Sequence, residues 1–118
     1  NEFDTQSRNA KADATSASLK SARIMSDLGL AIQADKDNQY LYYNRGCVYM
    51  AERDYTHAID DFTRAINIDH SLAEAYYNRG LARVQNGLKS EGIADLSKAG
   101  ELGLYKAYSV IKKISKSI

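Results

Sequence analysis

The chain repeats itself at a fixed spacing. The pentapeptide Tyr-Tyr-Asn-Arg-Gly begins at residue 42 and again at residue 76, and 76 − 42 = 34. Further pairs of like residues share this offset: Ile59 and Ile93, Asp61 and Asp95, Phe62 and Leu96, Ala65 and Ala99. A repeat of this length is typical of a pair of helices that cannot bury its apolar face alone and must stack on its neighbours. The sequence therefore predicts an all-α solenoid of helical hairpins.

Two complete hairpins are predicted, over residues 39–72 and 73–106. In the first, apolar residues recur at three- and four-residue steps on either side of a polar break at residues 52–54. The second follows the same plan, with Gly87 at a turn where glycine adopts a positive φ without steric cost. Small residues stand where the helices would cross: Gly46, Ala58, Gly80 and Gly92. The polar side of the second helix is expected at Asp60, Asp61, Thr63 and Arg64.

The N-terminal region departs from this plan. Residues 21–38 match the second helix of the repeat, with Asp27 aligned on Asp61, while residues 1–20 are rich in small and polar side chains. Residues 1–38 are therefore either a degenerate repeat with a degraded inner helix or one long N-terminal helix.

The C-terminal region, residues 104–118, is amphipathic, and we predict a capping helix whose lysines face water. The alternative, a basic patch for nucleic acid or a membrane, lacks the interleaved aromatic residues that stacking requires. The whole chain, residues 1–118, is predicted to form a single domain.

Composition excludes several classes of function. The net charge is +1, from 16 basic and 15 acidic residues, so no strong field favours nucleic acid or an anionic membrane as a partner. Cys47 is the one cysteine, which rules out an internal disulfide and any multi-cysteine zinc or iron–sulfur site. No apolar run is long enough to span a bilayer, so we expect no membrane insertion and, by default, a cytoplasmic location. Because residue 1 is asparagine and not methionine, a piece of a longer polypeptide is expected.

Catalysis is not expected. The candidate groups are Cys47, His57 and His70, and none has a spacing that pairs a nucleophile with a base. Two histidines without a cysteine or carboxylate at ligand spacing make a poor metal site. Asp60 and Asp61 are adjacent on a predicted helix and point to different sides. We therefore predict a protein that is not an enzyme and has no cofactor and no metal.

The repeat resembles that of the tetratricopeptide repeat family. The family's characteristic positions hold, in the first unit, Tyr42, Arg45, Gly46, Tyr49, Ala58, Phe62, Ala65 and His70, of which six fit. In the second unit they hold Tyr76, Arg79, Gly80, Arg83, Gly92, Leu96, Ala99 and Leu104, a looser match. Arginine replaces a large apolar residue in both units, and the terminal proline is absent. The resemblance covers residues 21–118 and implies a right-handed helical superhelix.

The resemblance also implies that the inner helices line a concave groove for a peptide segment of a partner protein. The residues that would face it are Tyr40, Tyr43, Asn44, Cys47, Met50, Glu74, Tyr77, Asn78, Leu81 and Gln85. Some family members grip a C-terminal carboxylate there, but Tyr43 and Cys47 stand where a lysine and an asparagine would be needed. We therefore expect an apolar or aromatic peptide, because tyrosine offers a large, rigid contact area at low entropic cost.

Two hypotheses of function follow. The first is an adaptor or scaffold module that binds a protein segment in this groove. The second is a structural or self-associating element without its own ligand, which forms a homodimer through its N-terminal helix or through the open end of the solenoid. For Tyr40, Tyr43 and Tyr77, packing and groove roles fit equally well. Four other tyrosines are assigned to the core: Tyr42, Tyr49, Tyr55 and Tyr76.

Overall fold

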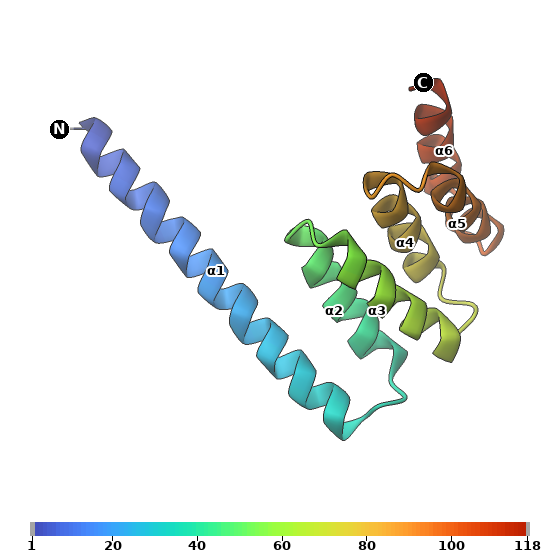
Figure 1. The fold of residues 1–118 in the computed structure, drawn as a ribbon, viewed down its shortest axis with the longest axis horizontal. Coiled ribbons are helices and arrows are strands. Elements are labelled where there is room, and N and C mark those ends of the chain that lie inside the picture. Colours follow the sequence, from blue (N-terminus) through green and yellow to red (C-terminus); the bar gives the residue numbers. More distant parts are fainter. Residues whose placement is uncertain (1, 118) are drawn as a thin grey trace.

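The structure is a computed structural model that describes the backbone of residues 2–117 and the side chains of residues 16–117. Six helices follow one another along the chain (Figure 1): α1 (Glu2–Ala34), α2 (Gln39–Ala51), α3 (Tyr55–Ile68), α4 (Ala73–Gln85), α5 (Lys89–Glu101) and α6 (Lys106–Lys116). Helices α2 and α3 form one hairpin, α4 and α5 form a second, and α6 lies against α5. No strand occurs between residues 2 and 117, and the predicted all-α solenoid of hairpins is confirmed.

The first hairpin begins and turns in ways that its sequence explains. The side chains of Asn38 and Asp54 accept hydrogen bonds from backbone amides of α2 and α3, at 3.0 and 3.3 Å, and so satisfy free donors at the start of each helix. Arg53 and Gly87 occupy equivalent turn positions, with φ of 61° and 84°. The positive φ predicted for Gly87 is confirmed, whereas Arg53 adopts it despite its Cβ.

Glycines let the helices of each hairpin cross at close range, as the sequence predicts. A Cβ added to Gly46 would lie 2.6 Å from Cε1 of the Phe62 ring. A Cβ added to Gly80 would lie 2.8 Å from the carbonyl oxygen of Gly92, and one added to Gly92 would lie 2.7 Å from that of Gly80. Because backbone atoms cannot rotate away as side chains can, the crossing of α4 and α5 is the more demanding of the two.

Two apolar clusters form much of the core, one between the two hairpins and one between the second hairpin and α6. One joins Ala65 and Ile66 of α3 to Ala75 of α4, and the other joins Leu96 and Ala99 of α5 to the capping helix. The four tyrosines assigned to the core are half-buried: Tyr42 and Tyr76 pack around the first cluster, and Tyr49 and Tyr55 lie in α2 and α3 on either side of the turn at residues 52–54. Burial in the two hairpins is therefore concentrated on the small and apolar residues of the outer helices.

Arginine at the family's apolar position forms an ion pair in each hairpin. Arg45 donates two hydrogen bonds to the carboxylate of Asp61, at 2.7 and 2.8 Å. Arg79 binds Asp95 in the same way, at 2.8 and 2.7 Å, and Arg83 adds a third bond at 2.8 Å. The expected place of Asp61 on the polar side of its helix is wrong, because the residue is 2% exposed. The arginine replaces the lost hydration of this carboxylate and permits its burial.

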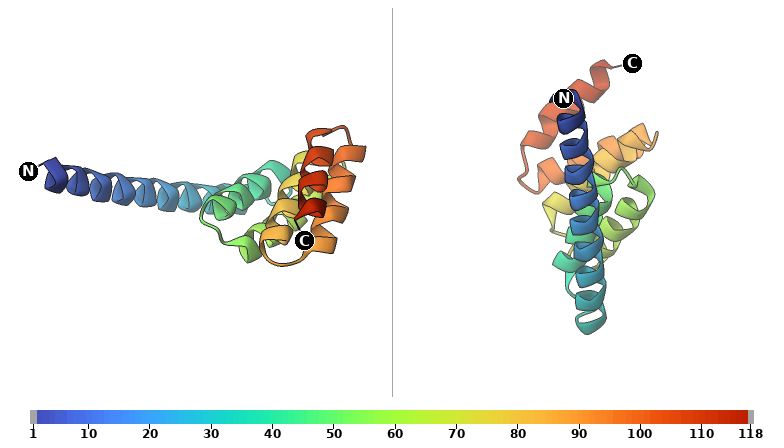
Figure 2. Two further views of the ribbon diagram at one scale, coloured as in Figure 1. Left: turned by 90° about the horizontal axis from the view of Figure 1, so that it is seen from above. Right: turned by 90° about the vertical axis from the view of Figure 1, so that its left-hand side faces the viewer.

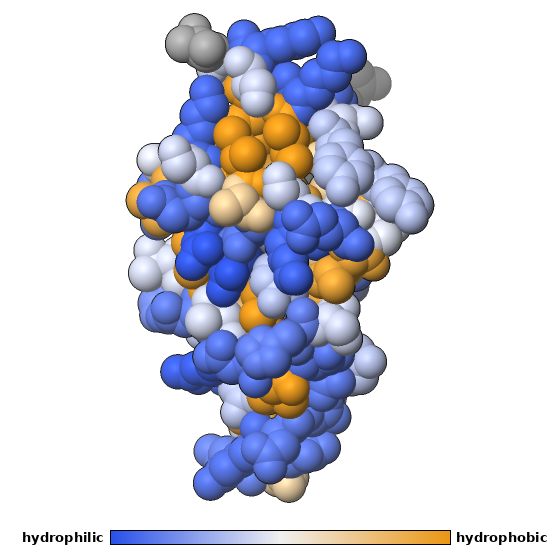
Figure 3. Space-filling view, turned by 90° about the vertical axis from the view of Figure 1, so that its right-hand side faces the viewer, coloured by the Kyte–Doolittle hydropathy of each residue, from blue (hydrophilic) through white to orange (hydrophobic). Residues whose placement is uncertain are grey.

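Helix α6 closes the C-terminal end of the stack. Ala107 is buried against Leu96 and Ala99, and Val110, Ile111 and Ile114 pack around them while staying half-exposed. The lysines of this helix are exposed: Lys106, Lys112, Lys113 and Lys116. Figure 3 views this end of the molecule and shows apolar side chains framed by hydrophilic ones.

Helix α1 is a single helix of 33 residues. Residues 18–20, which correspond to the turn at residues 52–54, are helical. At 1.5 Å per residue α1 is about 50 Å long. Its C-terminal half lies near α2, and its N-terminal half extends away from the hairpins (Figures 1 and 2). No helix in the described part of the chain, α1 included, is both long and apolar enough to cross a membrane.

Candidate functional site

The centre of the predicted groove is Tyr43, at the contact between the inner helices α2 and α4. Its hydroxyl accepts a hydrogen bond from Nδ2 of Asn78 at 3.0 Å. Its ring lies tilted against Phe62, with the ring centroids 5.8 Å apart. The side chains of Cys47 and Glu74 are near enough to this hydroxyl to raise its pKa. Four of the ten predicted residues therefore come together: Tyr43, Cys47, Glu74 and Asn78.

The Tyr43 hydroxyl and the Cys47 thiol of this cluster are held neutral. Burial raises the pKa of the Tyr43 hydroxyl, and Cys47 and the negative charge of Glu74 raise it further. Burial also raises the pKa of the Cys47 thiol, with a smaller contribution from Glu74. Both groups are therefore protonated at neutral pH, and the cluster presents uncharged hydrogen-bonding groups beside one carboxylate.

A second part of the predicted groove is engaged by the C-terminal end of the fold. Tyr77 packs against the cluster formed by Leu96, Ala99 and Ala107, and Nζ of Lys106 lies 4.7 Å from the centre of the tyrosine ring. Leu81 packs on the same cluster. These two side chains therefore contribute to holding α5 and α6 in place, whatever else they contact.

The remaining predicted residues are more accessible. Tyr40 is 55% exposed at the start of α2, and Asn44 follows one helical turn later, also exposed. Gln85 is exposed at the end of α4, and Met50 is half-buried near the end of α2. That all ten residues face one ligand stays a prediction, but the exposed pair of Tyr40 and Asn44 is free to contact one.

The groups considered for catalysis do not form a reactive set. A raised pKa keeps the Cys47 sulfur as a thiol, whereas a nucleophile or metal ligand must be a thiolate. Cys47 lies in α2, whereas His57 lies in the first turn of α3, where its Nδ1 is 2.7 Å from Asp54 and its ring stacks on Tyr49. Among the residues that the structure describes, no three His, Cys, Asp or Glu side chains gather in a way that could hold a metal ion.

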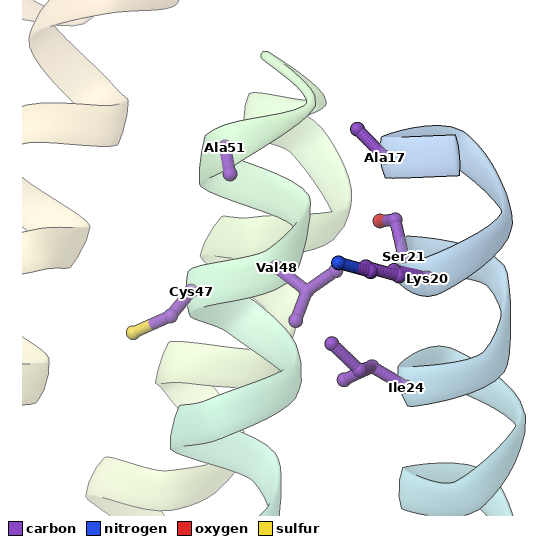
Figure 4. Close-up of a pocket in the computed structure, with 7 residues that line it drawn as sticks. All are labelled: Ala17, Lys20, Ser21, Ile24, Cys47, Val48 and Ala51. Atoms are coloured by element: carbon purple, nitrogen blue, oxygen red, sulfur yellow. The ribbon is translucent and has the colours of Figure 1, made fainter. Parts of the chain in front are cut away.

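An apolar hollow of about 400 Å³ lies between α1 and α2, and the sequence did not predict it (Figure 4). It is lined by Ala17, Lys20, Ser21 and Ile24 of α1 and by Cys47, Val48 and Ala51 of α2. The sequence contains one sign of this hollow: the repeat position that holds the aromatic Tyr55 in the first hairpin holds the small Ser21 in α1. Ser21 instead donates a hydrogen bond of 2.6 Å to Glu52 across the gap between the two helices.

Sequence comparisons agree with the repeat geometry. A family model described as a tetratricopeptide repeat (TPR) matches residues 48–87. The photosystem I assembly protein Ycf3 of Acaryochloris marina is 30% identical over 71 residues, which cover 59% of this chain and 43% of that protein. Human neutrophil cytosol factor 2 is 40% identical over 57 residues, which cover 48% of this chain and 11% of that protein. The chain thus spans less than half the length of these curated relatives.

Solved structures match over most of the chain. The first TPR of Spaghetti (RPAP3), bound to the HSP90 peptide SRMEEVD, has a TM-score of 0.79 and 25% identity, over 91% of this chain and 86% of that one. The second TPR domain of human RPAP3, in complex with the HSP70 peptide SGPTIEEVD, has a TM-score of 0.78 and 28% identity, over 92% of both chains. With two hairpins in register, arginines and glycines at equivalent positions and these similarities, the chain belongs to the tetratricopeptide repeat family.

Proposed function

We propose that this chain is a non-catalytic protein-interaction module that binds a peptide segment of a partner on the face formed by α2 and α4. The tetratricopeptide fold is that of an interaction scaffold, and two similar domains hold chaperone peptides. The observation that carries the proposal is the arrangement on α2, where exposed Tyr40 and Asn44 adjoin the neutral pair of Tyr43 and Asn78. An exposed tyrosine beside an exposed amide offers both contact area and hydrogen bonds to a peptide.

The proposed peptide is neutral or basic and carries an aromatic or aliphatic side chain. The chaperone peptides held by the similar domains share the acidic ending EEVD. In this chain the corresponding face has uncharged Tyr43 and Cys47, and the carboxylate of Glu74 adds negative potential beside them. Glu74 would repel a C-terminal carboxylate, while a neutral or basic segment meets no such penalty.

A phage-displayed library of random peptides tests the proposal with the whole chain as bait. Selected peptides are then synthesised with a fluorophore and titrated by anisotropy, with SRMEEVD in its acid and amide forms as reference probes. The test variant is Tyr40→Ala with Asn44→Ala, since both side chains are exposed and their loss leaves the core intact. The matched control, Asp60→Ala with Asn67→Ala, changes two exposed residues on α3.

We expect selected peptides rich in aromatic or aliphatic residues, with affinity reduced about tenfold or more in the test variant and unchanged in the control. Selection of no specific peptide would overturn the binding function. Tight binding of SRMEEVD that is lost on amidation would instead overturn the proposed peptide chemistry and indicate a carboxylate grip.

A further inference from the structure

Helix α1 contains the sequence of both helices of a repeat, joined without a turn. At the repeat offset, residues 5–17 correspond to the inner helix α2, and residues 21–34 correspond to the outer helix α3. Lys11 then takes the position of Arg45, and Asp27 takes that of Asp61. In each hairpin the inner helix folds back onto the outer one, whereas in α1 the two continue in line.

The outer half of α1 therefore lacks the inner helix that covers α3 and α5. Ile24 is 48% exposed, while Ala58 at the equivalent position of α3 is fully buried. Asp27 is exposed, although Asp61 is buried against Arg45. The apolar hollow lies between α1 and α2, and Ile24 points into it from α1 (Figure 4).

The sequence of α1 suits a second copy of itself as the missing helix. A stripe of small and apolar residues recurs at alternating steps of four and three: Ala10, Ala14, Ala17, Ser21, Ile24, Leu28 and Ala31. Such a spacing is that of helices that pack in pairs. Ala10, Ala14 and Ala17 of this stripe lie in the N-terminal half of α1, and its two large residues, Ile24 and Leu28, lie in the C-terminal half. In an antiparallel pair centred on residue 19, Ala14 would face Ile24 and Ala10 would face Leu28.

Charge specifies the same register. Arg45 reaches Asp61, and Arg79 reaches Asp95, across the hairpins, and the equivalent pair is Lys11 with Asp27. On one straight helix these two residues are about 24 Å apart, at 1.5 Å per residue, and cannot meet. In the antiparallel pair centred on residue 19, Lys11 of each copy lies opposite Asp27 of the other, so two-fold symmetry forms this contact twice.

The residue at the turn position disfavours closure of α1 onto itself. Arg53 and Gly87 take positive φ at the turns of the two hairpins, and the equivalent residue is Leu19. Leucine would adopt that conformation only at a steric cost, as Arg53 does, because its Cβ approaches the backbone carbonyl oxygen, and no glycine occurs between residues 5 and 28 to remove the cost. A hinge that is short and strained when closed favours exchange of helices between copies.

We propose that two copies of this chain form a two-fold symmetric, helix-exchanged dimer through α1. The N-terminal half of α1 from each copy fills the hollow between α1 and α2 of the other and acts as the inner helix of its first repeat. The proposal does not rest on the peptide-binding function, because the dimer uses α1 and leaves the exposed Tyr40 and Asn44 of α2 uncommitted.

The experiment measures the mass of the whole chain by sedimentation equilibrium over a range of concentrations. The dimer has twice the chain mass of 13.1 kDa. Ile24→Asp places a charge in the stripe and is expected to raise the dimer dissociation constant at least tenfold. Leu30→Asp is the matched control, since Leu30 is 62% exposed on the same helix outside the stripe and should leave the constant unchanged.

A charge exchange tests the register independently of Ile24. Lys11→Asp and Asp27→Lys should each weaken the dimer, and the two changes together should restore it. Circular dichroism verifies that each variant is folded.

A dimer with a micromolar dissociation constant would be mostly formed at about 100 μM, so a chain that stays monomeric at that concentration would overturn the proposal. So would a dimer that Ile24→Asp leaves intact, because it would use another surface. A folded double charge variant that stays as weak as its single variants would overturn the antiparallel register.

Discussion

Helix α1 and the pair formed by α2 and α3 carry the same repeat, yet only the pair is packed. Phe62 of α3 is fully buried, and Leu28, at the equivalent position of α1, is half-buried. Asp61 is buried in an ion pair with Arg45, while Asp27, at the equivalent position of α1, is exposed. The difference shows that repeat register alone does not produce burial. A position becomes part of the core only when the facing helix of its hairpin is folded against it.

Two local features account for the difference. The turn at residues 52–54 leads into α3 through the cap of Asp54, whose side chain accepts an amide hydrogen bond. The equivalent residue before the outer half of α1 is Lys20, which offers no acceptor for that role. With a helix-favouring run of Ala, Ser, Leu and Lys in place of a break, the chain continues as helix.

The largest expected contrast is between Phe62→Ala and Leu28→Ala. Phe62→Ala should lower the free energy of unfolding by about 3–5 kcal/mol, because it empties a fully packed position. Leu28→Ala should lower it by only about 1 kcal/mol, because half of that side chain is already in water. Urea denaturation measures both, in the Ile24→Asp background so that no second copy covers α1. Equal losses would mean that α1 is packed as tightly as α3.

A second contrast compares the equivalent carboxylates. Asp95→Ala removes the carboxylate that Arg79 and Arg83 share in a part-buried site, and should lower the free energy of unfolding by about 2–3 kcal/mol after allowance for their partial exposure. Asp27→Ala, in the same Ile24→Asp background, should change it by less than about 0.5 kcal/mol, as at other exposed positions. A large effect of Asp27→Ala there would reveal a partner for this carboxylate within one copy.

Glycine substitutions should differ in sign between the two regions. Gly80→Ala forces a Cβ against the carbonyl oxygen of Gly92 and should lower the free energy of unfolding by about 1–3 kcal/mol. Gly29→Ala meets no atom within 4 Å and should raise it by about 0.5–1 kcal/mol through helix propensity. Thermal unfolding of both variants gives the signs directly. A destabilising Gly29→Ala would show that this side of α1 is covered.

Much of the fold could be predicted from the sequence because apolar and small residues recur at the repeat offset. The repeat offset located both hairpins, and the close contacts of Gly46, Gly80 and Gly92 follow from their positions at helix crossings. The burial of Asp61 was missed because helical periodicity assigns a charged residue to water unless its partner is known. A signal was present, since Arg45 and Asp61 recur together as Arg79 and Asp95.

The candidate site was less predictable, for two physical reasons. Whether Tyr77 and Leu81 face a ligand depends on how closely α6 packs, and an amphipathic pattern does not fix that distance. The hollow between α1 and α2 depends on the absence of a turn in α1, and helical periodicity alone does not show whether residues 18–20 form a turn or continue the helix.

The smallest expected effect concerns pH and the Cys47 thiol. Because burial raises the pKa of this thiol, the folded chain keeps its proton where the unfolded chain loses it, near pH 8.5. The resulting stabilisation is present below that pH and is lost as pH rises through it. Thermal unfolding from about pH 7.5 to 9.5 should therefore show a falling midpoint that Cys47→Ala makes flatter. Tyr105→Phe, at an exposed ring, is the control and should keep the slope.

The same titration shows which face of α2 the Cys47 thiol serves. Cys47 lines the hollow, but its sulfur points away from α1 (Figure 4). A second copy in the hollow should therefore leave the desolvation of the thiol unchanged, and the parent chain and Ile24→Asp should lose stability with pH at the same rate. A steeper loss in the parent chain, at concentrations where it is dimeric, would show that the second copy reaches the thiol from the face of α2 that carries Tyr43.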